Sequence, residues 1–189
     1  MIKSVHPSDA VFGYLCEDPD GKNTTLGFYR FEARDVKGSH LKTIAISEQW
    51  VTNLEQMDLS SPVLSLTFTR SMSGRLKVIV ANEKFIAIIN SRDGKLESTI
   101  NLEDEGLTNK PLVKVFPVQL GFGVIMGNEI IVKRLTSAGK VDQSFSPCQT
   151  FLPLSDAVYE FRNPGFIFAL TETSNELVIF QLSSGQGEC

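Results

Sequence analysis

Few residues of this chain have the types and spacing that enzyme chemistry needs. Its two histidines, His6 and His40, lie in polar segments, and neither is spaced with a cysteine as a metal site requires. No local pattern joins a nucleophile to a base and an orienting acid. We therefore expect no catalytic residue, no bound metal and no cofactor, and we predict that the chain is not an enzyme.

Two short motifs resemble binding loops, but turns between strands explain them better. Residues 121–127 resemble a nucleotide-binding glycine loop, which must be followed by a helix N-terminus, whereas here another strand is predicted. Residues 18–23 resemble the start of a calcium loop. Lys22 takes the fifth position, where an oxygen ligand is needed, and Tyr29 takes the twelfth, where a glutamate closes such a loop. We predict that neither motif holds a ligand.

Composition restricts the class of partner. The chain has 189 residues and a formal net charge of −4, with 18 basic residues scattered among 22 acidic ones. Nucleic acids and anionic membranes are usually bound by a basic face, so we expect no direct nucleic-acid partner. No segment approaches the roughly 18 consecutive apolar residues of a membrane-spanning helix, so we predict no membrane span.

The cysteines and the first residues indicate a compartment. Cys16, Cys148 and Cys189 are an odd number without a CxxC pair, which predicts free thiols in a reducing environment. Residues 1–9 are too polar for a secretory signal. We therefore predict a cytoplasmic or nuclear protein, in which Cys16 is a small buried side chain within a strand.

The elements that would position any site are strands. Residues 63–69 alternate between apolar and hydroxyl-bearing side chains, the period of a strand with one buried face. Residues 76–81 and 85–89 are nearly continuous apolar runs, joined by a connection short enough for a hairpin. Residues 96–102 alternate again. Four such strands joined by tight turns predict an antiparallel meander.

This pattern recurs along the chain. A phrase of Asn-Glu, a mostly apolar run, a serine-containing turn and glycine occupies residues 82–94, 128–139 and 175–185, and its glycines lie 45 and 46 residues apart. A period in the forties is typical of β-propeller blades. We predict one all-β domain, a propeller-like array of about four four-stranded antiparallel blades, over residues 1–50, 51–105, 106–149 and 150–189.

Two of these segments resemble the third strand and turn of WD-repeat propeller blades. In residues 85–95 and 177–186 an apolar strand leads to a turn with glycine, and Ile89-Asn90 and Phe180-Gln181 stand where that family typically has Trp-Asp. The Trp-Asp pair itself is absent, and no Gly-His dipeptide opens a blade. The resemblance is to a divergent WD-like class and implies the same propeller fold over most of the chain.

The last unit is predicted to begin with a strand over residues 157–161 and to lack its fourth strand. A single blade exposes two apolar faces, so blades must stack and the row must close or be covered. We therefore predict part of a larger or partner-completed propeller. An unpaired strand edge would attract a partner strand, and the candidate contacts there are Leu177, Val178, Ile179 and Phe180.

The predicted function is that of a non-catalytic protein–protein interaction scaffold. Its partners would be other subunits of a multi-protein complex, including a chain that completes the propeller. The alternatives are a propeller that binds a ligand or a lipid headgroup in a central channel and, less favoured, a propeller hydrolase.

Three segments supply candidate partner contacts. Residues 41–46 are predicted to form the fourth strand of the first blade, and residues 47–62 an irregular inter-blade segment with one short helical turn or a loop. The only tryptophan lies in this segment, where it would either anchor a partner or cover the edge of the core. Residues 70–75 form a basic loop, and residues 101–110 form an acidic connection between blades. The candidate contacts are Trp50, Arg70, Arg75, Glu103, Asp104 and Glu105.

Overall fold

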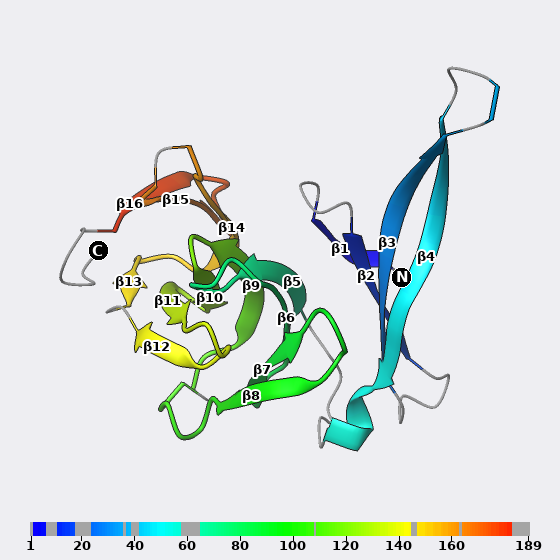
Figure 1. Cartoon of the computed structure of the whole chain (residues 1–189). Coiled ribbons are helices and arrows are strands. Elements are labelled where there is room, and N and C mark those ends of the chain that lie inside the picture. Colours follow the sequence, from blue (N-terminus) through cyan, green and yellow to red (C-terminus); the bar gives the residue numbers. More distant parts are fainter. Residues whose placement is uncertain are drawn as a thin grey trace.

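The chain folds into four successive antiparallel sheets (Figure 1). The computed structural model describes residues 2–6, 11–17, 24–35, 37–38, 42–57, 65–107, 109–144, 147–162 and 164–182. Within these ranges the regular elements are sixteen strands and one turn of 3-10 helix. Each sheet is built from strands that are consecutive in the sequence, so we name the sheets blades 1 to 4 in chain order.

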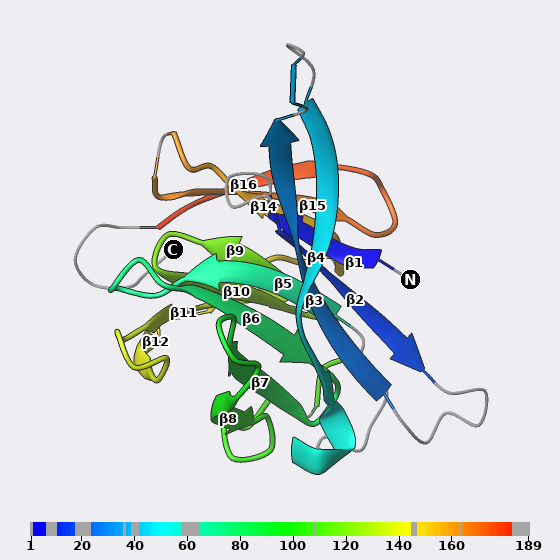
Figure 2. The ribbon, with the colours of Figure 1, turned by 45° about the vertical axis from the view of Figure 1, so that its right-hand side comes forward.

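Blade 1 contains an unusually long hairpin. Its strands are β1 (Ile2–His6), β2 (Val11–Glu17), β3 (Thr24–Asp35) and β4 (Lys42–Asn53), and η1 (Leu54–Met57) follows. The pairing of β2 with β3 ends at Val11 and Arg30, whereas β3 and β4 remain paired as far as Asp35 and Lys42. The hairpin therefore extends beyond β2 as an arm, which Figure 2 shows reaching past the other sheets.

The predicted end of this hairpin is wrong. The sequence predicted a strand over residues 41–46 and an irregular segment from residue 47, but β4 continues to Asn53. A bulge in the pairing between Phe28 and Tyr29 leaves Gln49 of β4 without a partner residue on β3. Because a bulge shifts the alternation of faces by one residue, Trp50 lies on the same face as its partner Phe28 and packs against the core.

Blades 2 to 4 are compact meanders. Blade 2 comprises β5 (Ser65–Arg70), β6 (Leu76–Ala81), β7 (Phe85–Asn90) and β8 (Leu96–Asn101). Blade 3 comprises β9 (Leu112–Val118), β10 (Gly121–Met126), β11 (Glu129–Leu135), β12 (Val141–Ser144) and the short β13 (Cys148–Gln149). The described part of blade 4 comprises β14 (Leu154–Tyr159), β15 (Phe166–Thr171) and β16 (Leu177–Gln181).

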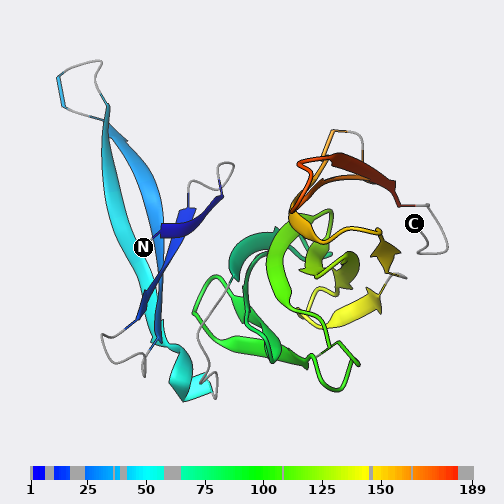
Figure 3. The same cartoon turned by 180° about the vertical axis from the view of Figure 1, so that it is seen from behind.

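The blades follow one another in an arc. Their first strands β1, β5, β9 and β14 lie side by side in that order, and the later strands extend away from them. Figures 1 and 3 show blades 1 and 4 at the two ends of this succession. Three apolar clusters fill the three spaces between neighbouring blades. The fold is the predicted all-β, propeller-like array of about four blades.

The continuous apolar runs of blade 2 supply apolar side chains to both faces of its sheet. Successive residues of a strand point to opposite sides of a sheet. Val78 and Ile89 accordingly contact blade 1, and Ile79 and Ile88 contact blade 3. All four are fully buried, and each such side chain contributes about 1.5–3 kcal/mol to stability. We call the face turned toward the next blade the forward face and the opposite one the rear face.

The cysteines differ from expectation in two respects. Cys148 is buried between blades 3 and 4 and is disulfide-bonded, so the prediction of free thiols is wrong for this residue. Cys16 is a free thiol, as predicted, but it is exposed. It follows Leu15 on β2, and because Leu15 points into the core, Cys16 points to the other face. Cys189 lies outside the described residues.

Candidate functional site

Corresponding pairs of apolar residues mark the forward faces of blades 2 and 3. Ile79 lies opposite Ile88 across β6 and β7, and Ile125 lies opposite Ile130 across β10 and β11. All four side chains have no exposed surface, because the rear face of the next blade covers them. A forward face of this fold is therefore normally an interior surface.

Blade 4 presents such a face to solvent. Phe168 lies opposite Ile179 across β15 and β16, with Val158 on its other side on β14. Ile179 is 57% exposed and Leu177, two residues earlier on the same face, is 63% exposed. We refer to Val158, Phe168, Leu170, Leu177 and Ile179 as the blade 4 forward face.

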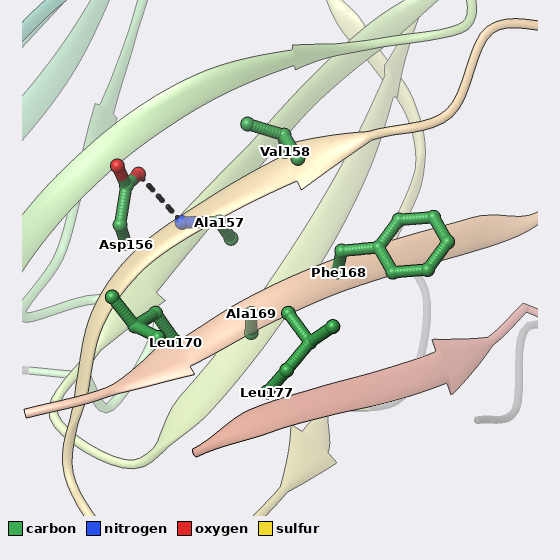
Figure 4. Close-up of a pocket in the computed structure, with 7 residues that line it drawn as sticks. All are labelled: Asp156, Ala157, Val158, Phe168, Ala169, Leu170 and Leu177. Atoms are coloured by element: carbon green, nitrogen blue, oxygen red, sulfur yellow. Dashed lines mark hydrogen bonds between the residues drawn. The ribbon is translucent and has the colours of Figure 1, made fainter. Parts of the chain in front are cut away.

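A shallow hollow of about 240 Å³ lies on this face (Figure 4). Seven residues of β14, β15 and β16 line it: Asp156, Ala157, Val158, Phe168, Ala169, Leu170 and Leu177. Asp156 is the one charged residue among them. Its carboxylate is paired with Lys114 of β9 and also accepts the backbone N–H of Ala157, at 2.7 Å. The hollow is therefore apolar, with one neutralised charge beside it.

The opposite end of the arc also carries an exposed apolar face. On the rear face of blade 1, the buried ring of Phe12 stacks on the partly exposed Tyr29, with centroids 5.3 Å apart, and contacts the partly exposed Phe31 at 4.9 Å. Farther along the arm Ile46 lies opposite Phe31, and Ile44, which is 72% exposed, follows on the same face. We refer to these five residues as the blade 1 rear face.

One polar interaction orders the centre of the blade 1 rear face. The hydroxyl of Tyr29 donates a hydrogen bond to Oε2 of Glu48, at 2.7 Å. The Glu48 carboxylate as acceptor, followed by the neighbouring Tyr14, raises the pKa of Tyr29 above its usual value. The phenol therefore remains neutral and remains a donor throughout the ordinary pH range.

Trp50 lies at the junction of blades 1 and 2. Its indole N–H donates to the carbonyl oxygen of Ser91, at 2.8 Å, and its ring stacks on Phe28 with centroids 5.2 Å apart. Gly94, at φ +69°, lies against the indole so closely that a Cβ there would be 2.8 Å from the ring. This is the arrangement of a residue that covers the core edge between blades. A partner contact at Trp50 stays a prediction.

The charged loops contain both exposed residues and residues that support the fold. Arg70 donates to the carbonyl oxygen of Gly74 in its own loop, at 2.6 Å, and Arg75 is exposed. Glu103 and Asp104 are exposed, whereas Glu105 pairs with the buried Lys133, at 2.8 Å. Partner contacts at these five residues stay predictions.

The predicted edge contacts divide between two faces. Val178 and Phe180 pack toward blade 3, whereas Leu177 and Ile179 point to the exposed forward face. In the part of the chain that the structure describes, β16 pairs with β15 alone. The predicted run therefore contributes two residues to the core and two to the exposed face.

Sequence reasoning missed a polar cluster between blades 2 and 3. The ammonium of Lys77, almost fully buried, lies 2.5 Å from Oε1 of Glu97, and the side-chain amide of Asn90 donates to the same oxygen at 3.0 Å. The other carboxylate oxygen of Glu97 is buried without a hydrogen-bond partner among the described residues and lies against Gly139. A lysine inside the apolar run 76–81 was the available signal, because buried lysines require a partner.

The described residues offer no cluster that could hold a metal ion. No group of three or more His, Cys, Asp or Glu side chains within them could hold a metal ion. No helix in the same ranges is long and apolar enough to cross a membrane. Residues 121–127 form β10 and the turn after it, and β11 follows, so the glycine-rich motif has no helix N-terminus. His40 and residues 18–23 lie outside the described ranges.

Comparisons with known proteins support the fold and do not identify a family. No protein-family model and no curated protein sequence matches the chain. A solved structure of dihydro-heme d1 dehydrogenase NirN in complex with DHE is similar over 97% of this chain and 42% of its own, with a TM-score of 0.53 and 12% identity. A protein of unknown function from Bacteroides caccae matches 98% of this chain and 63% of its own, with a TM-score of 0.36 and 9% identity. The chain thus spans less than two thirds of either structure.

Proposed function

We propose that this chain is a non-catalytic protein-interaction module that acts as a subunit of a larger assembly. In this proposal the exposed faces at the two ends of its arc bind other protein surfaces. One observation carries the proposal: the forward face that blades 2 and 3 bury completely is exposed on blade 4. We also propose that the chain is a member of the divergent WD-like class of propellers.

The free-energy cost of exposing these apolar faces to water favours their binding to another protein. Apolar surface removed from water contributes about 25 cal/mol per Å², so ordered rows of exposed Ile, Leu, Val and Phe favour association. Scattered exposed apolar residues are ordinary, but contiguous ones mark interaction sites. The blade 4 forward face is contiguous across three strands, and the blade 1 rear face adds aromatic side chains, which are enriched at interface cores.

The shape of the hollow favours a protein partner over a small ligand. Ligand sites are usually concave cavities of about 300–1,000 Å³ with several convergent polar groups. The hollow on blade 4 is smaller and shallow, and the one charged side chain among its lining residues is already paired. A flat apolar face is better suited to packing against a sheet of another protein than to enclosing a small ligand.

Site-specific photo-crosslinking in an extract of the source organism tests this proposal. A photoreactive phenylalanine analogue is placed at Ile179 and, as a matched control, at Met72, an exposed apolar residue in the turn between β5 and β6. We expect discrete protein adducts from position 179 and few from position 72, identified by mass spectrometry. Equal adducts from both positions, or none from position 179, would contradict the proposal.

A further inference from the structure

We propose that the partner of blade 4 is blade 1 of a second copy of this chain, so that two arcs meet head to tail and close one ring. This inference rests on the proposed function, because it names the partner of the same exposed faces. In it, the blade 4 forward face of each copy packs on the blade 1 rear face of the other.

The internal junctions supply the pattern for this contact. Blade 1 packs its forward face on the rear face of blade 2, and the same arrangement joins blade 2 to blade 3 and blade 3 to blade 4. Among the residues that the structure describes, one forward face and one rear face are left, at opposite ends of the arc. A contact between blade 4 of one copy and blade 1 of another is therefore the next junction in the same series.

The two free faces have compatible chemistry. Ile179, Leu177 and Val158 on blade 4 are aliphatic, whereas blade 1 offers the partly exposed aromatic rings of Tyr29 and Phe31. The junction of blades 1 and 2 already has this composition, since Phe28 packs there beside Leu66 and Val80. Aromatic and branched aliphatic side chains pack well across such interfaces.

The carboxylates of Asp156 and Glu48, which lie beside the two faces, already have partners within their own chain. Asp156, beside the blade 4 hollow, is paired with Lys114 of its own chain. Glu48, beside the blade 1 rear face, accepts the Tyr29 hydroxyl of its own blade. Uncompensated buried charge is the usual obstacle to packing two faces together, and both carboxylates avoid it.

Two copies also satisfy the geometry of propellers. Rings usually contain four to eight blades, so two four-bladed arcs reach the upper end of that range. A two-fold axis makes the two contacts identical, and head-to-tail contacts that close leave no free face.

The first experiment measures the mass of the purified chain in solution by size-exclusion chromatography with light scattering. We expect twice the 20.9 kDa of one chain. Ile179→Arg on blade 4 and Ile46→Arg on blade 1 should each reduce the mass toward that of one chain, whereas Phe151→Arg, at a fully exposed loop residue, should leave it unchanged. Leu177→Arg replaces Ile179→Arg if circular dichroism shows that the latter is unfolded.

Mixing the two variants tests the head-to-tail arrangement. Ile179→Arg retains an intact blade 1 rear face, and Ile46→Arg retains an intact blade 4 forward face, so the mixture can form one native junction. We expect a two-chain species in the mixture that neither variant forms alone. A dimer that joined blade 4 to blade 4 would be insensitive to Ile46→Arg and would show no recovery on mixing.

The outcomes separate this inference from the proposed function. A folded wild-type chain with the mass of one copy at all concentrations overturns the second-copy inference. If position 179 nevertheless crosslinks to a different protein, the proposed interaction module stands with another partner. If the chain is a single copy and position 179 gives no adduct, both proposals fail.

Discussion

Lys77 places a positive charge inside the junction of blades 2 and 3, where its ion pair with Glu97 compensates the loss of hydration. Its ammonium is almost fully buried and lies 2.5 Å from Glu97. We expect Lys77→Met to reduce the free energy of unfolding by roughly 3 kcal/mol, because it leaves the Glu97 carboxylate without a counter-charge. Urea denaturation measures the change.

Two further variants separate the charge from packing. Lys77→Met combined with Glu97→Met should regain most of the lost stability, since removing both members of a buried pair is often neutral. Lys95→Met removes an exposed lysine 3.7 Å from Asp93 and should change stability by less than about 0.5 kcal/mol. Equal losses in Lys77→Met and Lys95→Met would show that burial of this pair is unimportant.

Gly139 is required for two independent reasons. Its φ is +77°, a conformation that costs other residues about 1–2 kcal/mol, and a Cβ there would collide with the Glu97 carboxylate. Gly74 has a similar φ of +73° with no atom within 4 Å of a Cβ. We expect Gly139→Ala to destabilise the chain by roughly 1 kcal/mol more than Gly74→Ala in the same urea measurement. Equal costs would mean that the contact with Glu97 relaxes freely.

At the scale of elements, the continuity of the apolar pattern decided what the sequence could predict. β6 and β7 are nearly uninterrupted apolar runs because both of their faces are buried, and their predicted positions agree closely with the structure. β4 was truncated in the prediction because the bulge opposite Phe28 breaks the period of two. β14 was placed at residues 157–161, but it spans Leu154–Tyr159. The predicted strand extended to Phe161 because that residue is apolar, but the Phe161 side chain is exposed and contacts Tyr159 at the surface.

The faces of the candidate site could be predicted only in part. Leu177 and Ile179 were named for a strand edge, yet their significance lies in the sheet face that they share with Phe168 and Val158. A single sequence gives the alternation along each strand but not which blade covers which face. The aromatic group on blade 1 was missed because its members come from two strands brought together by pairing.

The hydrogen bond of Trp50 fastens strand β4 to the neighbouring blade. Trp50→Phe keeps an aromatic ring but leaves the Ser91 carbonyl without its donor. We expect a loss of about 1 kcal/mol in the free energy of unfolding, the usual contribution of one such bond. We also expect the backbone amides of residues 42–53 to exchange hydrogen faster in Trp50→Phe than in the wild-type chain. An unchanged stability would indicate that ring packing alone joins β4 to blade 2.

At the scale of the whole molecule, burial predicts a gradient of stability along the arc. Blades 2 and 3 are covered on both faces, whereas blades 1 and 4 are covered on one. Regions with few buried contacts open most easily, so amides of β6, β7, β10 and β11 should exchange most slowly with deuterium. The arm beyond Arg30 should exchange fastest among the strands of blade 1. Uniform protection across all four blades would contradict this gradient.

The position of Trp50 also gives the molecule an internal optical probe. It is the only tryptophan in the chain, and its indole is enclosed by Phe28, Gly94 and the Ser91 carbonyl at a single blade junction. Its fluorescence therefore reports solvent entry between blades 1 and 2, while far-ultraviolet circular dichroism reports all strands together. Coincident transitions would identify a cooperative arc, and an earlier fluorescence transition would show blade 1 separating while the other blades remain folded.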